Sequence, residues 1–142
     1  MKRETDAVDK HKLLQNKLLS SLIRKLKCKY VLGYDVSVCQ GSRMRIPDVS
    51  VWEKFIEDDE QSCYSNLLTT IEITYTPFNE RMAHASIAAI FEMSSSVRES
   101  FIYNYITQQW TRYSRTDKGI EKEDGKDYSS VLKSYLHTLL VS

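Results

Sequence analysis

The sequence predicts a single α/β (α+β) domain over residues 1–142, with a central mixed sheet flanked by helices. Apolar residues recur at helical spacing near both ends of the chain and alternate with polar residues over short runs between them. With 142 residues, such a domain buries about two-thirds of the surface of its unfolded chain. The expected order of elements is α-β-β-β-α-β-β-α, in which the helices cover the sheet.

The first predicted element is an amphipathic helix over residues 6–27, followed by an antiparallel hairpin. Its apolar positions recur at helical spacing between Lys and Gln residues: Val8, Leu14, Leu18, Leu19, Leu22, Ile23 and Leu26. Residues 30–39 alternate and are rich in Val and Tyr, which predicts a strand. A turn at residues 40–42 and a second strand over residues 43–52 complete the hairpin.

The remaining elements follow from the same patterns. The polar, acidic segment 53–65 predicts a mobile loop, and residues 67–76 predict a strand that ends at Pro77. Asn79 is the expected N-cap of an alanine-rich helix that runs to residue 94. Residues 97–106 and 110–115 then predict a hairpin that turns at residues 107–109. A polar loop over residues 116–127 precedes a helix over residues 128–140.

Composition restricts the function only weakly. The formal net charge of +1 neither requires nor excludes an anionic partner, although basic residues are concentrated in the first helix. A basic helix can bind nucleic acid, but it is more often a solvated face. Cys28, Cys39 and Cys63 have no metal-type spacing and predict free thiols in a reducing cytoplasm. Because no apolar run is long enough to span a bilayer, a cytoplasmic protein without a membrane partner is expected.

Two carboxylates within apolar strands are the main functional signal. Asp48 follows Pro47 at the start of an apolar run, and Glu72 lies between Ile71 and Ile73. An unpaired buried charge is costly, so a carboxylate in this position needs a partner. If the two strands are neighbours, both acids could bind one Mg²⁺ or Mn²⁺ ion. Alternatively, Asp48 caps a turn and Glu72 pairs with a Lys or Arg side chain.

The order of elements and several short motifs resemble the PD-(D/E)XK restriction-endonuclease-like superfamily, and within it the Uma2 family. The residues that carry this resemblance are His11 with Leu14, Leu18 and Leu22, the segment Arg45-Ile46-Pro47-Asp48-Val49-Ser50-Val51, Ile71-Glu72-Ile73 followed by Pro77, and Val97-Arg98-Glu99-Ser100-Phe101-Ile102. The resemblance implies a metal-dependent DNA phosphodiesterase. It also implies that Asp48, Glu72 and the Ile73 carbonyl bind Mg²⁺ or Mn²⁺, with Asp48 and Glu72 as catalytic residues.

The sequence departs from the superfamily at its lysine. That residue is expected two positions after the second acid or on the following helix, but Thr74 occupies the first position and residues 79–94 contain no lysine. Arg81 and His84 are the candidates to replace it. A guanidinium is a poor base, whereas His84 could carry a proton near neutral pH as a third catalytic residue. His84 is equally consistent with a partly exposed position on the helix.

The absent lysine leaves two other functions open. One is a catalytically inactive domain of the same fold that binds nucleic acid or protein. The other is a small homodimeric adaptor that buries an aromatic strand or the terminal helix. Aromatic residues could stack on bases, but most of them lie in predicted strands and are expected in the core or at an interface: Trp52, Tyr64, Tyr75, Tyr103, Tyr105, Trp110 and Tyr113.

Overall fold

The computed structural model describes residues 2–26, 30–53 and 66–140, and these residues confirm the predicted fold class. The elements run in the order α1 (Lys2–Leu26), β1 (Tyr30–Tyr34), β2 (Val38–Gln40), β3 (Arg43–Arg45), β4 (Val49–Glu53), β5 (Asn66–Thr74), α2 (Pro77–Met93), β6 (Glu99–Asn104), β7 (Gln109–Thr116), β8 (Gly119–Asp124), β9 (Tyr128–Ser129), β10 (Ser134–Tyr135) and a short 3₁₀ helix, Leu136–Leu139.

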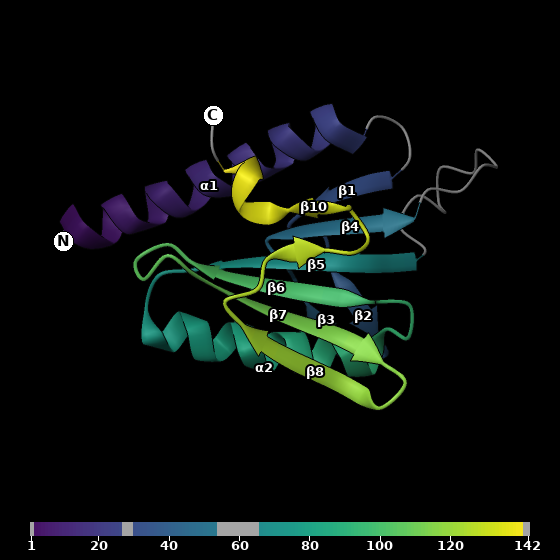
Figure 1. The fold of residues 1–142 in the computed structure, drawn as a ribbon. Helices are drawn as coiled ribbons and strands as arrows, with labels where there is room; N and C mark the ends of the chain where they lie inside the picture. Colours follow the sequence, from purple (N-terminus) through teal and green to yellow (C-terminus); the bar gives the residue numbers. More distant parts are fainter. Residues whose placement is uncertain (1, 27–29, 54–65, 141–142) are drawn as a thin grey trace.

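A mixed sheet separates the two α-helices that the structure describes (Figure 1). Within the described residues, the sheet has six strands in the order β1-β4-β5-β6-β7-β8. The β5–β6 pair is parallel, because α2 connects these strands across one face, and the other pairs are antiparallel. Helix α1 and the C-terminal segment cover the opposite face. Each face of the sheet therefore has its own apolar core.

The two cores explain the alternation seen in the sequence. On the α1 face, Leu18 and Leu22 pack with Ile71, Ile73 and Phe101. On the α2 face the core consists of Val38, Trp52, Leu67, Ala83, Ile87, Ile90, Phe91, Met93, Val97 and Ile102. Successive side chains of a strand point to opposite faces, so the apolar neighbours of Glu72 on β5 point towards α1. Glu72 itself points the other way.

The predicted N-terminal hairpin is present, but each of its long strands is divided in two. Strands β1 and β4 pair antiparallel, and β2 and β3 form a separate small hairpin. Asp35 interrupts the first strand with a left-handed φ of 52°, a conformation that aspartate tolerates better than most residues. Pro47 lies in the break between β3 and β4 and cannot donate a ladder hydrogen bond. The second break places Asp48 at a corner of the chain.

Helix α2 begins earlier than predicted. Thr76, and not Asn79, is the N-cap: its hydroxyl accepts a 3.0 Å hydrogen bond from the Asn79 N–H, and Pro77 occupies the first helical turn. Proline is favoured there because the first helical N–H groups have no partner within the helix. The predicted N-cap is therefore wrong by three residues, and Asn79 lies in the helix beside the functional site described below.

The C-terminal predictions are also wrong in part. The expected loop over residues 116–127 contains strand β8, which pairs with β7. The expected helix over residues 128–140 is replaced by β9, β10 and the 3₁₀ helix. Glu99, only 1 % exposed, accepts hydrogen bonds from the Ser129 hydroxyl and the Ser130 N–H. Lys133 then takes a left-handed φ of 54°, which an α-helix does not allow.

Some predictions can be placed only in part. Residues 54–65 of the predicted loop lie outside the described residues, as do Cys28 and Cys63. Cys39 is a free, exposed cysteine. Among the residues described, no helix has both the length and the apolar character needed to cross a bilayer.

Gly33 permits the close packing of β1 on β4. A Cβ added at this position would lie 2.2 Å from the Ser50 hydroxyl oxygen, which also accepts a 2.7 Å hydrogen bond from the Trp52 indole. We expect Gly33→Ala to lower the free energy of unfolding by about 1–3 kcal/mol, because Ser50 is buried and cannot easily move away. Chemical denaturation of both proteins measures this difference. The control is the same substitution in a Ser50→Ala background, which removes the hydroxyl that the new Cβ meets; an equal loss of stability in both backgrounds would contradict the prediction.

Candidate active site

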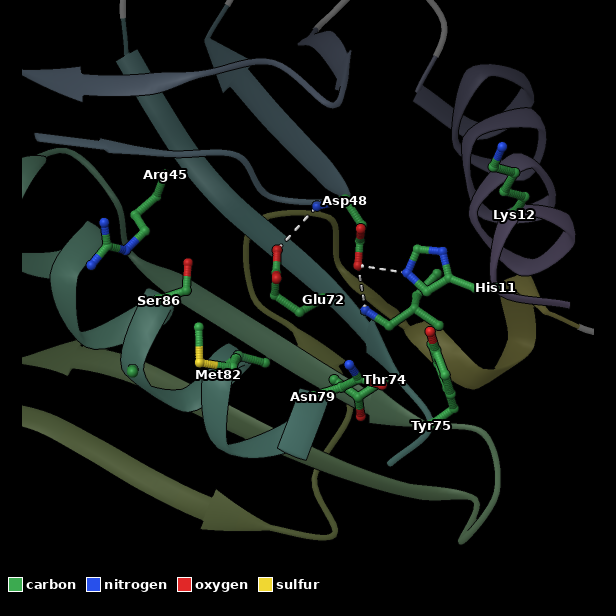
Figure 2. A pocket seen from close by; sticks show the side chains of 13 residues that line it. His11, Lys12, Arg45, Asp48, Glu72, Thr74, Tyr75, Asn79, Met82 and Ser86 are labelled. Atoms are coloured by element: carbon green, nitrogen blue, oxygen red, sulfur yellow. Dashed lines mark hydrogen bonds and ion pairs between the residues drawn. The ribbon is translucent and has the colours of Figure 1, made fainter. Parts of the chain in front are cut away.

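Asp48 and Glu72 lie on one cavity, at the end of β5 and between the two helices (Figure 2). The cavity has a volume of about 590 Å³. Its polar wall includes His11 and Lys12 from α1, Arg45 from β3, and Asp48. Strand β5 contributes Glu72, Ile73 and Thr74, and α2 contributes Asn79 and Ser86. A volume in this range can hold a small ligand or part of a larger one.

Asp48 is held by contacts with both α1 and β5. Its Oδ2 atom accepts a 2.8 Å hydrogen bond from the Ile73 N–H and lies 3.2 Å from Nε2 of His11. Its backbone N–H donates a 3.0 Å hydrogen bond to Oε1 of Glu72. The two acids predicted from the sequence are therefore in direct contact, although 24 residues separate them.

Glu72 takes part in no salt bridge with the residues that the structure describes. Burial raises the pKa of its carboxyl group well above the usual value, and the nearby Asp48 carboxylate raises it further. The hydrogen bond from the Asp48 N–H acts in the opposite direction and only partly offsets these effects. The pair of acids thus holds negative charge that a bound proton or cation would stabilise.

His11 and Gln15 connect α1 to the Asp48 corner. The hydrogen bond to Asp48 is the main cause of a raised pKa at His11, and burial opposes it. The Gln15 side-chain amide donates to the Asp48 carbonyl oxygen at 2.7 Å and to Oδ1 of Asp35 at 3.0 Å. Gln15 is 2 % exposed, so these bonds satisfy a buried polar group.

The sequence carried a signal for this role of α1. His11, Gln15, Leu18 and Leu22 recur at intervals of three or four residues, so the two polar residues continue the buried stripe of the helix. Polar residues in a stripe of this kind predict buried hydrogen-bond partners. His11 was expected only from the family resemblance, and no role was predicted for Gln15.

The structure places His84 away from the cavity. His84 lies on α2, but its Nδ1 atom is 2.5 Å from the hydroxyl of Tyr113 on β7. Burial is the main cause of a lowered pKa at His84, and the charge of Lys122 lowers it further. The neighbouring helical residues Met82, Ala83 and Ala85 line the cavity, whereas neither His84 nor the exposed Arg81 is among its lining residues.

The oxygen donors of the cavity fit a hard divalent cation that retains water. Within the described ranges, no group of three or more His, Cys, Asp and Glu side chains is arranged to hold a metal ion. Mg²⁺, however, is commonly bound by one or two carboxylates, with water and substrate phosphate completing its coordination. Asp48 and Glu72 match that donor chemistry: both line an open cavity, and the Asp48 carboxylate raises the pKa of Glu72. Asp48 and Glu72, with the Ile73 carbonyl, would hold the ion.

The raised pKa of Glu72 predicts that the stability of the folded protein depends on pH. The pKa of Glu72 is higher in the folded protein than in the unfolded chain, so protonation of this carboxyl group stabilises the fold. This stabilisation is complete at pH values below the ordinary pKa of glutamate and is lost as the pH rises through the pKa of the folded protein. In EDTA, we therefore expect Glu72→Gln to melt at a higher temperature than the parent near pH 8, and the difference to vanish near pH 4. Thermal unfolding at both pH values measures this difference, with Glu121→Gln at an exposed position on β8 as the control. A lower melting temperature for Glu72→Gln near pH 8 would contradict the prediction.

Comparison with known proteins shows a nuclease-like fold. No family model and no curated protein matches the sequence. The structure is similar to a crystal structure from Anabaena variabilis ATCC 29413, described as "a putative nuclease belonging to DUF820". The TM-score is 0.67 at 16 % sequence identity, and the match covers 93 % of this chain and 82 % of that chain. The chain therefore has the α/β fold of that protein, with α1, the sheet and α2 arranged around the cavity.

Proposed function

We propose that the chain is a Uma2-like phosphodiesterase of the PD-(D/E)XK superfamily that cleaves DNA with Mg²⁺ or Mn²⁺. The contact between the Asp48 N–H and the Glu72 carboxylate carries this proposal, because it brings the two acids of the motif together on an open cavity. The nuclease-like fold supports the same function. DNA is the expected substrate, and the cytoplasm is the expected location of the protein.

The residues of the cavity have distinct roles in this proposal. Asp48, Glu72 and the Ile73 carbonyl bind the metal ion, which when bound lowers the pKa of water and offsets charge on the phosphodiester. His11 orients the Asp48 carboxylate through its hydrogen bond. Lys12 and Arg45 line the same cavity and attract the phosphate backbone. His84 takes no part, because it is bonded to Tyr113 outside the cavity.

Thr74 favours a second candidate function, a catalytically inactive domain that binds nucleic acid. It occupies the position of the superfamily lysine and lines the cavity. The cationic side chains of the cavity, Lys12 and Arg45, come instead from α1 and β3. From these positions they can bind a phosphate group without contacting the water that would attack it. This domain would bind the same backbone through Lys12 and Arg45 but leave it intact. The homodimeric adaptor has no comparable support.

Cleavage of DNA separates these two functions. We expect the parent protein to nick plasmid and single-stranded DNA in Mg²⁺ or Mn²⁺, and Asp48→Asn to reduce the rate by at least about a hundredfold, because a lost metal ligand removes several kcal/mol of transition-state stabilisation. Gel analysis of the products measures the rates. Asp124→Asn provides the matched control: the same chemical change at an exposed position on β8.

The outcomes of this experiment are distinct. Equal cleavage by the parent and Asp48→Asn would reject the assigned site. DNA binding without cleavage in either metal would identify the inactive domain. Loss of activity in Asp124→Asn as well would attribute the effect to folding and not to the cavity.

Lys12 provides a test of the charged wall of the cavity. We expect Lys12→Gln to raise KM for DNA about threefold at low salt with little change in kcat. The slope of log affinity against log salt concentration should fall by about 1, because one phosphate contact is lost. Steady-state cleavage and binding at several salt concentrations measure both quantities. Lys118→Gln, in the exposed turn between β7 and β8, removes the same charge elsewhere. Similar effects for both variants would indicate only a change in net charge.

A further inference from the structure

A second concave surface adjoins the carboxylate cavity at the stacked rings of Tyr75 and Tyr105, and its lining combines aromatic side chains with Leu14 and Leu140. Its volume is about 470 Å³, and its wall includes Lys10, Tyr103, Tyr105, Gln108, Trp110 and His137. We propose that this surface, the aromatic groove, binds an unpaired base of a single-stranded nucleic acid whose backbone continues into the carboxylate cavity. This inference deepens the proposed function and rests on it for the position of the scissile strand.

A pair of stacked tyrosines joins the two hollows. Tyr75 lines the carboxylate cavity, beside Thr74 and His11 in Figure 2. Its ring stacks on that of Tyr105 with 5.7 Å between the centroids and 26° between the planes, and Tyr105 lines the aromatic groove. Lys10 and Lys12, two residues apart on α1, line one hollow each. Because they project from opposite sides of the helix, a strand that crosses α1 at this turn would meet a cation at each hollow.

The lining of the groove matches the chemistry of a nucleobase. The rings of Tyr103 and Trp110 stack with centroids 4.6 Å apart, and Tyr103 remains partly exposed. The Lys10 ammonium lies 5.2 Å from the centroid of the Tyr105 ring and is itself exposed. Surfaces that combine aromatic rings with positive charge bind single strands through base stacking and phosphate attraction. No Asp or Glu is among the described residues that line the groove.

The groove favours a single strand over a duplex for a geometric reason. Bases of a duplex are stacked and paired along its axis, so they cannot enter a pocket unless they are flipped out. The exposed Gln108, at a φ of 59° in the turn between β6 and β7, supplies an amide that can bond to the edge of an unpaired base. His137 is already bonded through Nδ1 to Asp127 at 2.6 Å and contributes ring surface.

Trp110 makes the groove directly observable. The chain has two tryptophans, and Trp52 is buried in the α2 core with its indole bonded to Ser50. In full-length Trp52→Phe, fluorescence therefore reports on Trp110 alone. Titrations in EDTA prevent metal-dependent cleavage and measure binding separately from catalysis. The ligands are oligothymidylate, an abasic oligomer of equal length and charge, a blunt duplex, and thymidine monophosphate.

We expect oligothymidylate to quench Trp110 and to bind at least about tenfold more tightly than the abasic oligomer, because stacking requires a base. Tyr103→Leu should weaken oligothymidylate binding about tenfold while leaving the affinity for the abasic oligomer unchanged. Tyr113→Leu is the matched control, since Tyr113 is also partly exposed but packs on the α2 face of the sheet. It should bind oligothymidylate like the Trp52→Phe parent. Circular dichroism checks that each variant is folded.

Several results would overturn the proposal. Equal affinity for the abasic oligomer would mean that only phosphates are bound, and equal affinity for the duplex would exclude a single-strand site. Thymidine monophosphate binding as tightly as the oligomer would identify a nucleotide site instead. Absence of quenching, or equal losses in Tyr103→Leu and Tyr113→Leu, would also refute it. Cleavage that still depends on Asp48 would leave the proposed function standing in each case, so the two failures are distinguishable.

Discussion

The hydrogen bonds of Asp48 connect the parts of the molecule that form the site. Strand β3 has ended and β4 has not begun, so sheet pairing alone does not satisfy the polar groups of this residue. Its N–H is bonded to Glu72, its carbonyl to Gln15, and its carboxylate to the Ile73 N–H and His11. The same bonds fix α1 relative to β5. The fold therefore cannot form this corner without also bringing the two acids together.

This corner has an electrostatic cost that is concentrated on one residue. Asp48 has His11 and a backbone N–H as partners, whereas Glu72 accepts a hydrogen bond from the Asp48 N–H and faces the charge of the Asp48 carboxylate. An apolar or amide side chain at position 72 would avoid this repulsion. A carboxylate in such a position is typical of sites that bind a cation or a proton, where stability is lost in exchange for function. That cost is a physical reason to regard the pair as functional.

Strand β5 and the acid pair could be predicted from the sequence because their signals are local. Apolar alternation defines β5, and Glu72 stands out as a charged residue within it. The end of the chain could not be predicted in this way. The apolar spacing after residue 128 fits a helix, but Glu99 binds Ser129 and Ser130 from a strand about 30 residues earlier. The bond between His11 and Asp48 spans 37 residues, and the separation of His84 from the cavity depends on Tyr113, 29 residues away.

The position of the positive charge distinguishes this cavity from the motif that it resembles. A lysine at position 74 would be fixed to the same strand as Glu72, whereas Lys12 belongs to α1. Its placement therefore depends on how α1 docks through Gln15, Leu18 and Leu22. The packing of α1 on the sheet thus also places the positive charge of Lys12 at the cavity. Because Lys10 on the same helix lines the aromatic groove, a change that shifts α1 would alter both hollows together. Side chains carried by one rigid helix would align the proposed single strand with the acids more accurately than independent surface loops could.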